Sequence, residues 1–173
     1  MDSMSWWNAS GITRLRRSVV LPACPEQKLR GGTGVTALTA AQGVQHVTAV
    51  EADREVIDRL LEHISINDVQ NVSVYQGWVG QPTDADKPIH VHAVHLDRFE
   101  GVTAAEIDLE GNGLQVIDML PESVQTVFYE THPTMGVDAE LALHHLNAAG
   151  FDIIDRAIEW ETTGGEILVG YRS

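Results

Sequence analysis

The sequence has a single cysteine, only two lysines and no long apolar run. The lone Cys24 excludes a disulfide within the chain and a metal site built from several cysteines. A helix that spans a bilayer needs about 20 consecutive apolar residues, so we expect no membrane partner. The apolar run that ends before Pro22 is too short for the core of a secretory signal peptide. These absences predict a cytoplasmic protein.

Basic residues are also scarce. The chain has 11 Lys and Arg against 25 Asp and Glu, which gives a formal net charge of −14. Phosphate-binding surfaces need basic patches, so we expect no nucleic-acid partner. Few lysines with many aspartates favour the acidic surface of a halophilic protein, and an ordinary acidic protein is the alternative.

The charge is unevenly distributed. Residues 1–30 hold five basic and two acidic residues, a balance of +3, whereas residues 31–173 hold six basic and 23 acidic residues, a balance of −17. The first segment also lacks a clear helical or strand periodicity. We therefore expect an N-terminal arm over 1–30, truncated or altered relative to its relatives, and one domain over 31–173.

Beyond Gly31, strand and helix patterns alternate. The expected helices cover 35–42, 54–67, 112–120 and 138–149, and the expected strands cover 46–51, 71–79, 89–96, 106–109, 126–129, 153–160 and 166–171. Alternation of this kind predicts an α/β fold: a Rossmann-like, mostly parallel sheet with helices on both faces. The turn between the last two strands predicts a C-terminal antiparallel β-hairpin.

A glycine-rich turn opens this pattern. Gly31, Gly32 and Gly34 precede a helix, where backbone N–H groups and the positive helix end favour an anionic or polar ligand. Glu51 follows Gly32 by nineteen residues at the end of the next strand, the place from which an acidic side chain binds ribose hydroxyls. The pattern indicates a nucleoside-cofactor site, and a plain strand-to-helix turn is the alternative.

Polar residues mark the ends of the other expected strands. Together with Glu51 they are Gln76, Asp108, Glu130 and His132. Ligands in open parallel sheets bind beyond the carboxyl ends of the strands, so we expect these side chains to converge. His132 is a candidate general base on an acceptor hydroxyl, or else a structural loop histidine.

The sequence predicts no metal site. The histidines at 90, 92 and 95 fall on one expected strand, but alternation places His95 on the face opposite the other two. No other residue nearby completes a tetrahedral set, so we expect surface histidines there.

Several segments together resemble the FkbM-type family of class I S-adenosylmethionine-dependent methyltransferases. The matching segments are Val47–Asp53, Leu60–Asn67, Asn71–Val74, Leu96–Phe99, Ile107–Gly111 and Tyr129–Pro133. The most specific of them are Ile-Asp-Leu-Glu-Gly and the later Glu-Thr-His-Pro. The resemblance implies the class I methyltransferase fold, S-adenosylmethionine as cofactor, and methyl transfer to an oxygen of a small molecule or sugar.

The resemblance also implies a role for each matching residue. It assigns Gly31, Gly32 and Gly34 to the methionine part of the cofactor, Glu51 to the ribose, and Ala52, Gln76, Gly77 and Trp78 to the adenine end. Asp108 is expected at the methyl-transfer position, with Glu130 and His132 lining the acceptor side.

Two departures keep other hypotheses open. Lys28 stands where methyltransferases have an acidic residue, and Arg30 stands where they have the first glycine. The second hypothesis is therefore a catalytically disabled relative with a binding or assembly role. The third is a nicotinamide-dependent oxidoreductase, because Gly32, Gly34 and Ala37 also fit the dinucleotide fingerprint. The acceptor is not specified by the sequence, and a homo-oligomer remains open.

Overall fold

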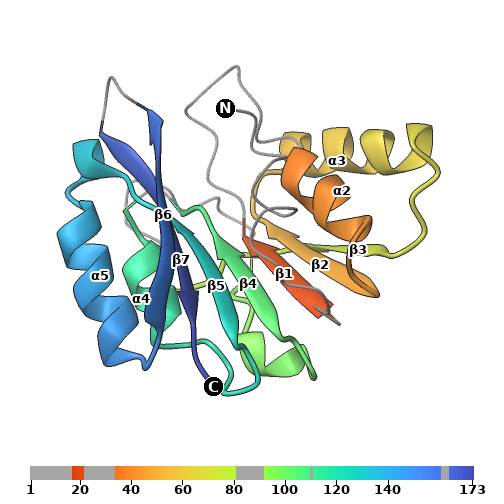
Figure 1. Cartoon of the computed structure of the whole chain (residues 1–173). Coiled ribbons are helices and arrows are strands. Elements are labelled where there is room, and N and C mark those ends of the chain that lie inside the picture. The colour runs from red at the N-terminus through yellow and green to blue at the C-terminus, as the bar shows by residue number, and fades with distance from the viewer. Residues whose placement is uncertain (1–16, 22–33, 81–91, 110, 161–163) are drawn as a thin grey trace.

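The computed structural model describes residues 17–21, 34–80, 92–109, 111–160 and 164–173. Within them, the chain builds one seven-stranded sheet in the order β3-β2-β1-β4-β5-β7-β6 (Figure 1). The strands are β1 (Arg17–Leu21), β2 (His46–Glu51), β3 (Val72–Gln76), β4 (Ala104–Ile107), β5 (Thr126–Glu130), β6 (Asp152–Trp160) and β7 (Gly165–Tyr171). The helices are α2 (Val35–Ala41), α3 (Arg54–Ile66), α4 (Gly113–Ile117) and α5 (Ala139–Ala148), with short 3₁₀ helices at Leu96–Arg98 and Pro133–Met135.

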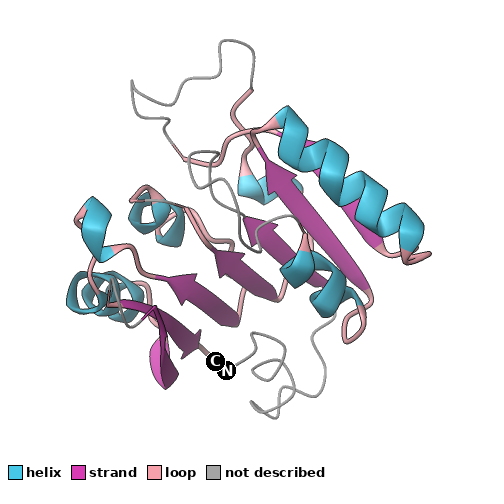
Figure 2. Cartoon of the chain, turned by 90° about the horizontal axis from the view of Figure 1, so that it is seen from above, coloured by secondary structure: helices cyan, strands magenta, loops and turns pink. Residues whose placement is uncertain are grey.

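The sheet is parallel from β3 to β5, and β7 and β6 complete it with antiparallel pairings. The connections that contain α2 and α3 run from β1 toward β3, whereas those that contain α4 and α5 run toward the hairpin. Right-handed crossovers in opposite directions place the two helix pairs on opposite faces, and the view from above shows helices on both sides of the sheet (Figure 2). The expected fold class is confirmed.

The first strand lies within the segment 1–30, where the sequence shows no clear strand periodicity. β1 pairs in parallel with β2 on one side and with β4 on the other, so it is the central strand of the parallel part. A short strand that is paired on both edges needs no polar–apolar alternation and leaves only a brief apolar run in the sequence. Residues 17–21 of the expected arm therefore belong to the sheet, and the rest of residues 1–30 lies outside the described residues.

The strand expected over 89–96 is also wrong in its described part. Residues 92–96 form only an isolated bridge, Ala93 with Trp78, before the 3₁₀ helix that begins at Leu96. The bridge is made by two backbone bonds of Trp78, from its N–H to the His92 carbonyl at 3.0 Å and from the Val94 N–H to its carbonyl at 2.8 Å. Residues 81–91, including His90, lie outside the described residues.

Two apolar clusters hold the layers together. The smaller one packs Ala37 and Ala40 of α2 and Leu60 of α3 against β2. The larger one joins β4, β5 and β7 to α4 and α5, and it includes the fully buried Ile107 and Leu146. Among the described residues, no helix is long and apolar enough to cross a membrane.

Arg172 ties the end of the chain to the loops at the amino ends of the strands. Its guanidinium donates hydrogen bonds to the carbonyl oxygens of Val124 at 2.7 Å, Ala149 at 3.1 Å and Pro121 at 2.6 Å. Its Cζ atom also lies 4.5 Å from the centre of the Phe151 ring. The planar fork of arginine can serve three acceptors at once, which a lysine cannot do in the same geometry.

We therefore expect Arg172→Met to lower the free energy of unfolding by about 2–4 kcal/mol, because partly buried carbonyls lose charged donors. Urea unfolding in high salt measures this. Arg54→Met is the control, since Arg54 makes an exposed i,i+4 pair with Asp58, and it should change stability by less than about 1 kcal/mol. Equal losses in the two variants would contradict a clamping role for Arg172.

Candidate functional site

The predicted polar residues do converge at the carboxyl ends of the strands. Glu51, Gln76 and Glu130 are the last residues of β2, β3 and β5. Asp108 follows β4 directly, and His132 comes two residues after β5. Gly31 and Gly32 lie outside the described residues, as do Lys28 and Arg30. The described part of the predicted site thus lies at the carboxyl ends of the parallel strands. We call this row of strand ends the carboxyl edge of the sheet.

The centre of this edge is the point where the strand order reverses. β1 has β2 on one side, with Val20 opposite Ala49, and β4 on the other side, with Leu21 opposite Ile107. Glu51 and Asp108 therefore flank the end of β1. Open α/β sheets bind their ligands in the crevice at such a reversal.

Glu51 is the most unusual side chain of this edge. It is only 2% exposed, and one of its oxygens, Oε1, accepts a hydrogen bond of 2.7 Å from the Asp53 N–H. The other oxygen, Oε2, is buried and has no hydrogen-bond partner among the described residues. An unsatisfied buried carboxylate oxygen is costly, and such an atom in a native protein calls for an explanation.

Burial dominates the ionisation of this group. The pKa of Glu51 is raised from 4.5 to about 7, mainly by desolvation, and the nearby negative charges of Asp53 and Asp108 contribute to this rise. Hydrogen bonds from the backbone N–H groups of Asp53 and Ala52 act in the opposite direction, because they stabilise the carboxylate.

The residues expected at the adenine end are held close to Glu51. The Gly77 N–H donates to the Glu51 carbonyl at 2.9 Å, and the Gln76 amide reaches the Ala52 carbonyl at 3.4 Å. Trp78 is 7% exposed, and its indole Nε1 has no hydrogen-bond partner among the described residues. The backbone of the ends of β2 and β3 is therefore fixed, but Trp78 offers little open ring surface for stacking.

The two described glycines of the predicted site are both required by packing. Gly34 begins α2 with φ of 92°, and a Cβ added there would lie 2.3 Å from Leu60 Cδ1. A Cβ on Gly77 would lie 2.0 Å from Val94 Cγ2. The positive φ of Gly34 and the close contacts of both positions explain the glycines without a ligand, so they do not by themselves identify a cofactor.

The expected acceptor side contains a histidine–carboxylate pair. His132 Nε2 lies 3.0 Å from Asp108 Oδ1, and both side chains are largely shielded from solvent. One ligand atom from each of Asp108, Glu130 and His132 lies within 4.8 Å of the others. The structure thus brings together the three residues that the sequence analysis expected on the catalytic side.

His132 is fixed by its backbone neighbours. Buried Thr131 exchanges two hydrogen bonds with Glu166 of β7, one from its N–H to the Glu166 carbonyl and one from the Glu166 N–H to its hydroxyl, each of 2.8 Å. The His132 carbonyl accepts from the N–H groups of Met135 and Val137. The role of Thr131 has no signal in the sequence, because its partner Glu166 lies 35 residues away across a strand pairing.

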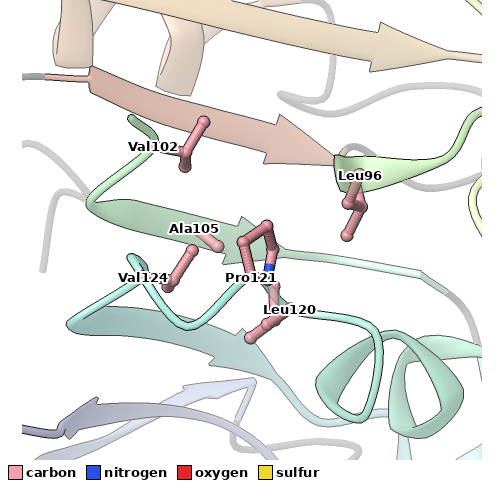
Figure 3. Close-up of a pocket in the computed structure, with 6 residues that line it drawn as sticks. All are labelled: Leu96, Val102, Ala105, Leu120, Pro121 and Val124. Atoms are coloured by element: carbon pink, nitrogen blue, oxygen red, sulfur yellow. The ribbon is translucent and has the colours of Figure 1, made fainter. Parts of the chain in front are cut away.

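A small pocket elsewhere does not belong to this site. It is lined by Leu96, Val102, Ala105, Leu120, Pro121 and Val124, all of them apolar (Figure 3). Val102 and Val124 precede β4 and β5, so the pocket lies toward the amino ends of these strands. It offers no side-chain hydrogen bond to a nucleoside.

Solved structures of methyltransferases share this fold. A precorrin-6y C5,15-methyltransferase from Geobacter metallireducens is 10% identical with a TM-score of 0.60, over 93% of this chain and 82% of its own. A ribosomal protein L11 methylase from Lactobacillus delbrueckii subsp. bulgaricus is 13% identical with a TM-score of 0.61, over 96% and 74%. A protein of the NADB-Rossmann superfamily from Streptococcus agalactiae is 14% identical with a TM-score of 0.66, over 100% and 69%.

At such low identities the likeness shows the fold alone. The chain has a Rossmann-like fold of the methyltransferase type. No protein-family model and no curated protein matches the sequence.

The raised pKa of Glu51 predicts how its replacement changes stability with pH. The folded state binds the Glu51 proton more tightly than the unfolded state, so this group contributes stability below pH 4.5 that is lost as the pH rises to about 7. The free energy of unfolding of Glu51→Gln should therefore increase by about 3 kcal/mol relative to that of wild type as the pH rises from 4.5 to about 7. Urea unfolding from about pH 5 to about pH 8 tests this.

The control is Glu62→Gln, because Glu62 is exposed on α3. Its difference from wild type should stay flat over the same range. A flat difference for Glu51→Gln as well would show that Glu51 is not desolvated in the folded protein.

Proposed function

We propose that this chain binds S-adenosylmethionine and transfers its methyl group to an oxygen of a small molecule or sugar, as in the FkbM-type family. The observation that carries the proposal is Glu51, whose buried Oε2 has no partner among the described residues at the reversal of strand order. A hydrogen bond donated by a ribose hydroxyl would give this oxygen the partner that it lacks. The methyltransferase-type fold supports the choice of nucleoside.

The residues of this edge fit the nucleoside half of the cofactor. Glu51 would bind the ribose hydroxyls, with Oε1 already oriented by the Asp53 N–H. Ala52, Gln76 and Gly77 would adjoin the adenine, since their backbone is fixed by the bonds between β2 and β3. Gly34, at the start of α2, would adjoin the methionine part.

The acceptor would approach from the side of β4 and β5. When bound, S-adenosylmethionine supplies a methyl group on a positively charged sulfur, which an acceptor oxygen displaces in line. His132 would take the proton of the acceptor hydroxyl, and the Asp108 carboxylate at 3.0 Å would stabilise the resulting imidazolium. Glu130 would line the acceptor side of the same edge.

The acceptor class follows from charge. A chain with a formal charge of −14 repels nucleic acid, which favours a small-molecule or sugar acceptor. The nicotinamide hypothesis is less well supported, because the Ile-Asp-Leu-Glu-Gly segment and the terminal hairpin of β6 and β7 favour the methyltransferase resemblance. The disabled-relative hypothesis rests on Lys28 and Arg30, which lie outside the described residues.

Calorimetric titration of S-adenosylmethionine and S-adenosylhomocysteine in high salt, with a chelator present, tests the cofactor. We expect both to bind wild type. Glu51→Gln should bind about 10–100-fold more weakly, because it loses hydrogen bonds to a charged acceptor. Glu62→Gln, which has the same change of charge on an exposed face, should bind as wild type does.

Nicotinamide dinucleotide is the competing ligand in the same titration. Binding of the dinucleotide in place of both sulfur nucleosides would favour an oxidoreductase. Failure of wild type to bind any nucleoside would overturn the enzyme proposal and favour a disabled relative.

Cofactor affinity should also depend on pH. The ribose hydroxyls need the Glu51 carboxylate as acceptor, and the pKa of Glu51 in the free protein is about 7. Affinity for S-adenosylhomocysteine should therefore rise with pH up to about 7 and level off above it. Glu51→Gln should lose this dependence, whereas a wild-type affinity that falls across the same range would contradict a ribose-binding carboxylate.

A further inference from the structure

We propose that Asp108, Glu130 and His132 form a binding site for one divalent first-row metal ion. Their ligand atoms gather within 4.8 Å of one another at the carboxyl ends of two neighbouring strands. This goes beyond the sequence analysis, which considered only the histidines at 90, 92 and 95 and predicted no metal. The site requires no part of the methyltransferase assignment.

The spacing of the ligand atoms suits an ion. For bonds of about 2.1 Å, two ligands at right angles lie about 3 Å apart and two opposite ligands about 4.2 Å apart. Asp108 Oδ1 and His132 Nε2 are separated by 3.0 Å, which matches adjacent positions around one ion. One ligand atom of each of the three residues lies within 4.8 Å of the others, so rotation of a side chain can bring all three to the distances that one ion requires.

The donor set also selects the class of ion. Two carboxylates favour hard ions such as Mg²⁺ and Mn²⁺, whereas an imidazole nitrogen favours ions such as Zn²⁺, Fe²⁺ and Ni²⁺. One imidazole with two carboxylates suits a divalent first-row ion that accepts both donor types, and Mn²⁺ is a suitable probe. The two carboxylates neutralise the ion, which lowers the cost of holding it in a partly buried place.

The backbone keeps the three residues in register. Glu130 is paired with Ile167 of β7, Thr131 is bonded to Glu166, and the His132 carbonyl accepts two N–H bonds. Asp108 follows β4, which pairs along its length with β5. The ligands thus come from two strands of one rigid sheet, so little order has to be gained when the ion binds.

A bound ion would change the role of His132 and narrow the class of acceptor. This consequence rests on the proposed function. The Nε2 lone pair of His132 binds either a proton or an ion, so with an ion bound His132 is a ligand and not the base. Three protein ligands leave positions open for oxygen atoms. The site would then prefer acceptors that chelate, such as neighbouring hydroxyls or a hydroxyl beside a carboxylate.

Titration with Mn²⁺ alone tests the site, with the free ion followed by electron paramagnetic resonance. High salt suppresses weak binding to the acidic surface. We expect one Mn²⁺ per chain in wild type. Asp108→Asn and His132→Gln should bind at least about tenfold more weakly, since even the loss of a group that orients a ligand costs this much.

The controls carry the same substitutions outside the site. Asp118→Asn changes an exposed residue after α4, and His144→Gln changes an exposed histidine on α5. Both should bind Mn²⁺ as wild type does. Circular dichroism confirms that each variant folds, and Glu130→Gln replaces any site variant that does not.

Wild-type binding in the site variants, or no stoichiometric binding in wild type, would overturn the proposal. Thermal unfolding gives a second readout, because Mn²⁺ should raise the midpoint of wild type and both controls but not of the site variants. No nucleoside is present in these titrations, and the cofactor titration contains a chelator. Failure of one proposal therefore leaves the other testable.

Discussion

The placement of Glu51 beside the end of β1 is the constraint on which the rest of the site depends. A carboxyl group that is 2% exposed is costly to bury, and the neighbouring backbone N–H groups of Ala52 and Asp53 offset part of that cost. The strand order provides the location. β1 separates β2 from β4 at the point where the strand order reverses, and Glu51 and Asp108 flank its carboxyl end. Ligands of open α/β sheets bind at such a reversal.

From this centre the two halves of the edge differ in chemistry. On the side of β2 and β3, the Gly77 N–H bond to the Glu51 carbonyl and the Gln76 side-chain amide bond to the Ala52 carbonyl fix the chain beside one carboxylate. On the side of β4 and β5, titratable side chains gather in the group of Asp108, Glu130 and His132. The proposed function uses this division, with the cofactor on the first side and the acceptor on the second. The division follows from the strand order, because β2 and β3 lie on one side of β1 and β4 and β5 lie on the other.

The sequence predicted those parts of the structure that depend on local patterns. Helical spacing identified α3 and α5, strand patterns identified β2 and β5, and the positions of Glu51, Asp108 and His132 at strand ends followed from them. β1 was missed because a five-residue strand between two parallel neighbours carries no periodic signal. The strand expected over 89–96 was wrong because its described residues form only one isolated bridge, between Ala93 and Trp78, despite their alternating pattern. Long-range partners such as Thr131 and Glu166 have no local signature at all.

One feature of the sheet bears on how the chain reaches this state. β7 is synthesised after β6, yet it lies between β5 and β6 and pairs with both. β6 therefore has no place in the sheet until residues 165–171 have been made, and the edge of β5 stays open until then. An open edge next to a buried core is a place where wrong pairing and association between chains begin. β6 and β7 are consecutive antiparallel strands, so their hairpin docks on β5 through β7, its second strand, and this docking must wait until residues 165–171 have been made.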